Sequence, residues 1–190
     1  IAFTGFYLDE SGMPPRFALL VGPPLVIIAV LFSTARGRRF IDGLDTGRLT
    51  LLHVVRIPVE FILLGLYLHG AIPEVMTFEG RNFDILSGLT APLVYWFGYA
   101  KPRFGRLVLL GWNIACLALL ANIVTHAVLA APTTFQQIAF EQPNVGVLYF
   151  PFVWLPCMVV PLVLFAHLAS IRRLLSGGSR VAAHAVHSAP

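Results

Sequence analysis

The sequence predicts an all-α protein, a polytopic helical membrane bundle of about five transmembrane helices. Of its 190 residues, 57% are hydrophobic and only 12% are charged, whereas a soluble domain carries about 25% charged residues. The mean hydropathy is +0.81. The apolar residues also gather into continuous runs that approach or exceed the roughly 20 residues needed to cross the hydrocarbon core. These observations leave no room for a sizeable soluble domain.

The apolar runs define the expected spans in chain order. We place them at Phe17–Arg36, Leu51–Leu68, Phe83–Ala100, Arg106–Leu129 and Val147–Leu175. Each should be a helix, because a segment inside the bilayer has to satisfy its own backbone hydrogen bonds. The first run contains Pro23 and Pro24, and the last contains Pro151, Pro156 and Pro161. Prolines in these helices predict bends and freed carbonyls, which occur in transporters and in plain structural bundles alike.

The expected domain organisation is a single membrane domain over residues 1–175 and a flexible cytoplasmic tail over residues 176–190. The tail is small and polar without periodicity. At the other end, the stretch Ile1–Tyr7 is too short to cross a bilayer. It fits either the end of a further helix upstream of Ile1, which would make six spans, or an interfacial segment.

The basic residues predict the orientation. If the spans alternate in direction, ten basic residues fall on one side and two, Arg16 and Arg81, on the other. The ten are Arg36, Arg38, Arg39, Arg48, Lys101, Arg103, Arg106, Arg172, Arg173 and Arg180. Cytoplasmic loops carry such an excess, so the N-terminus should be outside and the C-terminus inside. Short basic clusters between apolar runs indicate contact with anionic lipid and exclude nucleic acid as a partner.

The second span carries the most informative polar residues. His53, Arg56 and Glu60 fall within about 60° of one another on a helix, and Tyr67 continues that face. Glu60 should lie near the bilayer midplane, where a charge costs at least about 2.5–3.5 kcal/mol and has to face the bundle interior. Arg56 and Glu60 could form an ion pair that locks helices together. The alternative, which we favour, is that they line a polar intramembrane pocket.

A second group of polar residues lies toward the outer face. It consists of His69, Glu74, Glu79, Asp84, Asn122, His126 and Glu141. An outer solute or metal site is one interpretation, and a solvated acidic rim is the other. No spacing of the HxxxH or HExxH kind occurs, so we assign no metal ligands and favour the rim.

The histidines raise the possibility of haem. His69 and His126 lie near outer helix ends, and His53 and His167 near inner ends, as in membrane cytochromes with two b-type haems. However, His53 and His69 are sixteen residues apart, about 160° around one helix, whereas one helix that serves two stacked haems needs both on one face. The two cysteines, Cys116 and Cys157, are interpreted as packing residues.

The sequence contains no catalytic motif. GxSxG, P-loop and dinucleotide-binding patterns are missing, which argues against an enzyme. The preferred hypothesis is therefore an integral membrane protein whose polar pocket binds or moves a small solute or proton, or which serves as a subunit of a larger membrane assembly. A homo-oligomer or other membrane subunits are the expected protein partners. The alternative is a membrane redox component that binds haem or quinone through the transmembrane histidines.

Overall fold

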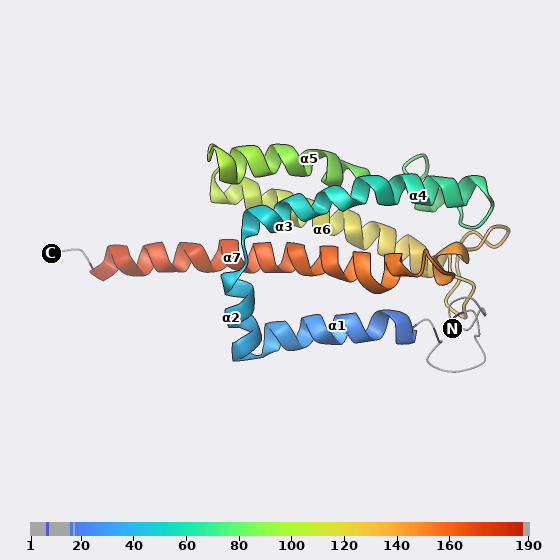
Figure 1. Cartoon of the computed structure of the whole chain (residues 1–190), viewed down its shortest axis with the longest axis horizontal. Coiled ribbons are helices and arrows are strands. Elements are labelled where there is room, and N and C mark those ends of the chain that lie inside the picture. Colours follow the sequence, from blue (N-terminus) through green and yellow to red (C-terminus); the bar gives the residue numbers. More distant parts are fainter. Residues whose placement is uncertain (1–6, 8–15, 17, 188–190) are drawn as a thin grey trace.

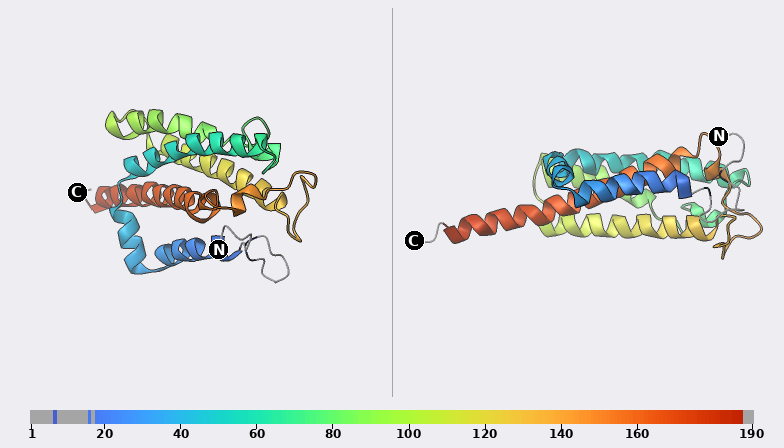
Figure 2. Two further views of the ribbon diagram at one scale, coloured as in Figure 1. Left: turned by 45° about the vertical axis from the view of Figure 1, so that its right-hand side comes forward. Right: turned by 90° about the horizontal axis from the view of Figure 1, so that it is seen from below.

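The described part of the chain is all-helical and contains no strand. The computed structural model describes Tyr7, Arg16 and residues 18–187, with side chains up to residue 176. Its α-helices are α1 (Ala18–Ser33), α2 (Ala35–Gly43), α3 (Thr46–Leu52), α4 (Arg56–Leu68), α5 (Ile85–Tyr95), α6 (Arg106–Leu129) and α7 (Val160–His187). The chain runs back and forth along one axis, so that successive long helices are antiparallel (Figure 1). The connections therefore alternate between the two ends of the bundle (Figure 2).

Three helical stretches in the described residues are long and apolar enough to cross a membrane. They are Thr46–Leu68, Arg106–Leu129 and Leu155–Ser176. The pair α1 and α2 passes the same test only if it counts as one span, and it is bent by 93°. The chain is thus a membrane-associated helical protein, as predicted, but the expected count of about five spans is not confirmed. Both helix bounds coincide with the prediction for Arg106–Leu129.

The predicted first span, Phe17–Arg36, is broken after Ser33. Helix α2 starts at Ala35 and turns away from α1. The Thr34 hydroxyl caps α2 by accepting a hydrogen bond from Gly37 N at 3.1 Å. A Cβ atom on Gly37 would clash with the backbone of Leu31, so only glycine permits a corner this tight. The Arg38 guanidinium donates to the Ser33 carbonyl at 2.6 Å and so satisfies the end of α1.

The predicted second span starts five residues earlier than expected, at Thr46, where Asp45 caps α3 by accepting from Arg48 N. Between α3 and α4 lies a 3₁₀ turn, η3 (His53–Val55). Pro58 explains this local tightening, because it has no N–H to offer the carbonyl four residues before it. The helical rod from α3 to α4 nevertheless continues to Leu68, as the sequence predicted.

The predicted third span, Phe83–Ala100, is helical from Ile85 to Ala100, but this stretch is shorter than a full crossing requires. Helix α5 has eleven residues, about 16 Å of the roughly 30 Å hydrocarbon core, and a π turn, η5 (Trp96–Ala100), follows it. It lies beside α3 and the start of α4 (Figure 1). The connection from α4 contains a 3₁₀ turn, η4 (Glu74–Met76), and buries Thr77 and Asn82 completely. This connection therefore folds back into the bundle and delivers residue 84 beside α4.

The predicted fifth span, Val147–Leu175, starts eight residues late. Its first part forms a 3₁₀ turn, η6 (Gly146–Leu148), and irregular turns, and the helix begins with a π turn, η7 (Leu155–Val159). The prolines account for this delay, since each removes a helical N–H donor. At the other end, α7 continues to His187 through most of the predicted tail, where the alanines after Val181 favour helix. Residues 188–190 and the predicted segment Ile1–Tyr7, apart from Tyr7, lie outside the described residues.

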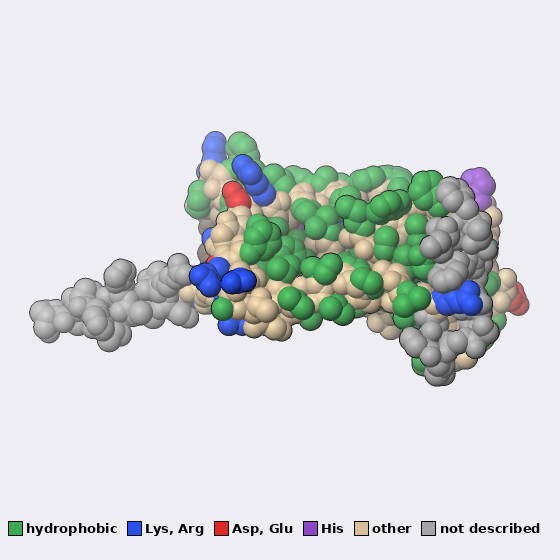
Figure 3. Space-filling view, turned by 60° about the horizontal axis from the view of Figure 1, so that its bottom comes forward, with side chains coloured by type: hydrophobic (Ala, Val, Ile, Leu, Met, Phe, Trp, Pro, Cys, Tyr) green, Lys and Arg blue, Asp and Glu red, His purple; other side chains and the backbone are tan. Residues whose placement is uncertain are grey.

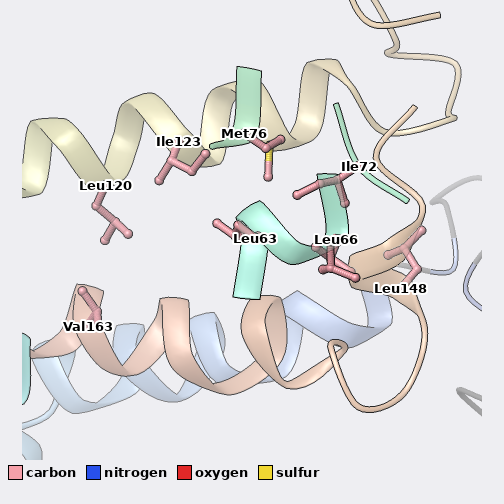
Figure 4. Packing of buried hydrophobic residues seen from close by; sticks show 9 residues of the cluster. Leu63, Leu66, Ile72, Met76, Leu120, Ile123, Leu148 and Val163 are labelled. Atoms are coloured by element: carbon pink, nitrogen blue, oxygen red, sulfur yellow. The ribbon is translucent and has the colours of Figure 1, made fainter. Parts of the chain in front are cut away.

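The hydrophobic core lies between α4, α6 and α7. Its buried residues include Leu63, Leu66, Ile72, Met76, Leu120, Ile123, Leu148 and Val163. Figure 4 shows these side chains directed from three helices and two connections toward one another. The outside of the bundle is also apolar: hydrophobic side chains cover the face between the two ends, and most blue basic atoms gather at the end where the C-terminal helix leaves (Figure 3). A surface of this kind suits lipid contact.

Candidate functional site

A buried arginine joins four helices at the centre of the molecule. Arg56 begins α4, and its side chain is 2% exposed. Its Nη1 donates to Asp84 Oδ1 at 2.6 Å, beside the start of α5, and to the Cys116 carbonyl of α6 at 3.4 Å. Its Nη2 lies 3.1 Å from His167 Nε2 of α7. Charged side chains this deeply buried require partners, and Arg56 finds one on each neighbouring helix.

The hydrogen bonds of His167 determine its tautomer. Arginine can only donate, so His167 Nε2 accepts from Arg56. The other ring nitrogen, Nδ1, lies 3.0 Å from Asn113 Oδ1, and the Asn113 amide donates to the Leu109 carbonyl at 2.9 Å. Asn113 Oδ1 is therefore the acceptor, and His167 carries its proton on Nδ1. Both nitrogens of His167 are engaged within the protein.

His53 stacks on this histidine. The ring centroids of His53 and His167 are 3.8 Å apart, with 16° between the ring planes. Trp112 packs edge-on against His53 at 5.6 Å and donates from Nε1 to Thr90 Oγ1 at 2.9 Å. His53 is completely buried, and neither of its ring nitrogens has a hydrogen-bond partner among the described residues.

Glu60 lies one turn beyond Arg56 on α4, but the two side chains share no hydrogen bond or ion pair in the described structure. Instead, Asn82 donates to Glu60 Oε1 at 2.6 Å and to the Met76 carbonyl at 3.0 Å. Asn82 Oδ1 accepts from the backbone N–H of Asp84 at 3.0 Å. Glu60 Oε2 has no partner among the described residues, although the side chain is 1% exposed. The folded-back connection thus supplies a partner to each ionisable residue of α4.

We refer to the residues of this network as the polar cluster: His53, Arg56, Glu60, Asn82, Asp84, Asn113 and His167. A partly enclosed cavity of about 90 Å³ adjoins it. Arg56, Glu60 and Asp84 line the cavity, and the rest of its wall is apolar, including Leu63, Ile123 and Val159. The residues that α6 contributes start at Leu120, beyond the Cys116 carbonyl that Arg56 contacts. The cavity therefore extends from the polar cluster toward the end of the bundle where α4 and α6 finish.

The structure brings together three of the four residues predicted for the pocket, but it gives Arg56 a different partner from the predicted one. His53, Arg56 and Glu60 are buried as predicted, but the partner of Arg56 is Asp84, which the sequence places in the outer group. Tyr67 does not join the polar cluster. It is half-buried against the hydrophobic core, because it lies eleven residues beyond Arg56 on the same helix, about 16 Å farther along the helix axis.

The remaining outer residues do not converge on one site. Glu74, Glu79, Glu141 and His69 are exposed, and Asn122 donates to the Arg81 carbonyl at 2.8 Å. The Nδ1 atoms of His69 and His126 each lie within hydrogen-bonding distance of a carbonyl one turn earlier in their own helix. The solvated rim therefore stays a prediction. The described residues contain no group of three or more His, Cys, Asp or Glu side chains that could hold a metal ion.

The inner pair of histidines, His53 and His167, is not arranged as two axial ligands of one haem. Two axial histidines must aim ring nitrogens at one iron from opposite sides. His53 and His167 instead stack face to face, and both nitrogens of His167 are engaged. Neither histidine lines the cavity, so the structure also offers no pairing of these rings with a quinone there.

The sequence reasoning missed Asn82, Asn113 and Trp112. Asn113 was recognisable in principle, because it is a lone amide inside an apolar run and shares a helix face with Cys116 and Leu120. Asn82 was not, since its position depends on a connection without periodicity.

The fold and the polar cluster define a helical membrane-associated protein with an ionisable centre inside its bundle. The chain belongs to the family described as a domain of unknown function, DUF8737, whose model matches residues 13–175. The match covers every residue of the polar cluster. No curated protein and no solved structure matches the chain.

Proposed function

We propose that this protein binds a small solute inside the membrane, in the cavity beside the polar cluster, and that Glu60 receives the polar group of that solute. The observation that carries the proposal is the composition of the cavity wall. It is apolar except for Arg56, Glu60 and Asp84. Such a wall suits a molecule with an apolar body and one polar group.

The unsatisfied atoms of the cluster define the chemistry of that group. Among the described residues, Glu60 Oε2 has no hydrogen-bond partner, while Oε1 accepts from Asn82. An unsatisfied buried acceptor costs about 1–3 kcal/mol. A solute that donates a hydrogen bond to Oε2 removes this cost, and an amine or a hydroxyl is therefore the favoured polar group. A proton would bind at the same oxygen, so solute and proton compete there.

The size of the cavity limits the solute. At about 90 Å³ it is smaller than the engineered apolar cavity of about 150 Å³ that binds benzene. The solute is therefore small, or it is the end of a longer molecule inserted through the open side. Binding is the function that these features support; movement across the membrane and a role as an assembly subunit have no comparable observation behind them.

The membrane arrangement belongs to the same proposal. We infer five crossings, in which the third combines α5 and η5 with the folded-back connection of residues 70–84, and the first is completed by the corner between α1 and α2. Broken spans whose helix ends meet at mid-depth are typical of intramembrane binding sites. The excess of basic residues at one end supports a cytoplasmic C-terminus and an external N-terminus.

Calorimetric titration of the purified full chain in detergent tests the proposal. The probes are hexylamine, hexanol and hexanoate, which share an apolar body and differ in the polar group. We expect hexylamine to bind more tightly than hexanol, and hexanoate to bind most weakly. Glu60→Gln should abolish the preference for the amine, and Glu74→Gln, at an exposed carboxylate, should preserve it. Equal binding of the three probes, or an unchanged preference in Glu60→Gln, would refute it.

A further inference from the structure

A second apolar space lies on the opposite side of α7. It is a groove of about 270 Å³ between α1 and the stretch formed by η7 and α7. Its wall is entirely apolar and includes Ile27, Ile28 and Leu31 from α1, and Met158, Pro161 and Phe165 from the facing helix. It shares no residue with the cavity beside the polar cluster. The groove is therefore a separate feature of the molecule.

Helix α1 is attached to the bundle mainly through this region. None of its residues is buried, and Val26 and Ile27 are 62% and 60% exposed. Its ring contact with α7, Phe32 against Phe165 at 6.3 Å, lies toward its end at the corner with α2. Farther along α1, the groove lies between this helix and the stretch formed by η7 and α7. Along the groove, α1 can gain further van der Waals contacts only from an apolar molecule that fills it.

Helix α2 bridges the end of the groove. It leaves α1 at the 93° corner and crosses to α7 (Figure 1). There Asp42 accepts two hydrogen bonds from Arg172, both at 3.0 Å, and its carbonyl accepts one from Arg173. This bidentate contact fixes α2 across the groove.

The bridge carries exposed positive charge. Arg36 and Arg39 lie three residues apart on α2, hence on one face of it, and both are exposed. Leu31, which lines the groove, precedes Arg36 by only five residues. The acid of the same helix, Asp42, is already bound by Arg172. The helix that bridges the end of the groove thus exposes two arginines that have no carboxylate partner among the described contacts.

We propose that this groove binds one anionic phospholipid of the inner leaflet, with an acyl chain between α1 and α7 and its phosphate on Arg36 and Arg39. The apolar wall and the basic bridge match the two parts of such a lipid. A second copy of the chain is the weaker fit, because a two-fold contact along this face would set the arginines of both copies against each other.

Native mass spectrometry of the full chain in uncharged detergent tests the proposal. Phosphatidylglycerol and phosphatidylcholine with identical chains are added in equal amounts, and the lipid retained by the protein is identified. We expect one retained lipid, with phosphatidylglycerol preferred about tenfold or more, since each basic residue near a phosphate contributes about fivefold. The double variant Arg36→Gln/Arg39→Gln should lose this preference. Arg48→Gln, at another exposed arginine, should keep it.

Two further variants separate the groove from the headgroup site. Ile28→Trp fills the groove and should abolish retention, whereas Val26→Trp, on an exposed part of α1 outside the groove, should not. Equal retention of both lipids by the unaltered protein would overturn the proposal. So would displacement of the lipid by inorganic phosphate alone, an equal effect of the two tryptophan variants, or a dimer that Ile28→Trp dissociates.

Discussion

The Asp84 carboxylate, which lies just before helix α5, pairs with the Arg56 guanidinium at the start of α4 at 2.6 Å, and both side chains are less than a tenth exposed. This pair joins the start of α5 to the middle of the helical stretch Thr46–Leu68. Removal of one member leaves an uncompensated charge in the bundle interior, which costs about 3–5 kcal/mol.

The first prediction follows from this pair. Arg56→Met and Asp84→Leu should each destabilise the protein by about 3–5 kcal/mol, and the double variant should recover a large part of that loss. Denaturation of the purified protein in mixed micelles measures the effect.

The matched comparison uses Glu60. If Arg56 were paired with Glu60 instead, the double variant Arg56→Met/Glu60→Gln would recover as much stability as Arg56→Met/Asp84→Leu. We expect it to recover less. The exposed pair Arg48 and Asp45, separated by 4.0 Å, serves as a surface control and should contribute less than about 1 kcal/mol.

The second prediction concerns the close approach of α5 to α4. A Cβ atom on Gly88 would lie 2.8 Å from Ile57 Cγ1 and 3.2 Å from the Ile57 backbone nitrogen. Gly88→Ala should therefore destabilise the protein by about 1–3 kcal/mol through overpacking. Gly65→Ala in α4 is the control, because a Cβ there meets nothing within 4 Å and should raise stability by about 0.5–1 kcal/mol. Equal effects of the two substitutions would contradict the packing described for α5.

The third prediction concerns topology. In a chain with Cys116 and Cys157 replaced by alanine, single cysteines at Glu79 and Phe135 should react with an impermeant reagent from outside. Cysteines at Arg39 and Arg103 should react only after permeabilisation. A cysteine at Thr77 should stay unreactive, because this side chain is completely buried although it belongs to the same connection as Glu79. External labelling at Arg103 would reverse the proposed orientation.

The fourth prediction concerns the histidines. Because His53 and His167 stack and His167 is bonded through both nitrogens, protein expressed with an ample haem supply should purify without a Soret band. A Soret band that shifts on reduction and disappears in His167→Ala would contradict the described ring arrangement.

The sequence was most informative where the regular residue spacing of an α-helix continues through a whole span. The bounds of α6 and the burial of His53, Arg56 and Glu60 follow from apolar run length and from the 100° spacing of helical residues. The sequence was least informative where the backbone is not a regular helix. The connection of residues 70–84 has no helical period, yet it buries Thr77 and Asn82 and places Asp84 against Arg56.

The partners of the ionisable residues were unpredictable for the same reason. Arg56 and Glu60 are one turn apart, so the local interpretation was a pair along one helix. The actual partners, Asp84 and Asn82, come from a connection whose course depends on tertiary contacts and not on periodicity. The sequence did contain one useful signal. Arg56, Glu60 and Asp84 are an arginine and two acids at membrane depth, and each of them requires a partner. Asp84 was therefore a candidate partner for Arg56.

The fifth prediction tests the central claim, that Glu60 receives the polar group of a bound solute. The measurement is the infrared difference spectrum of the purified protein on addition of hexylamine. We predict a change in a carboxyl band that is lost in Glu60→Gln and retained in Glu74→Gln, because only the first carboxyl lines the cavity. A spectrum without any carboxyl change at saturating hexylamine, or the same change in Glu60→Gln, would contradict the account.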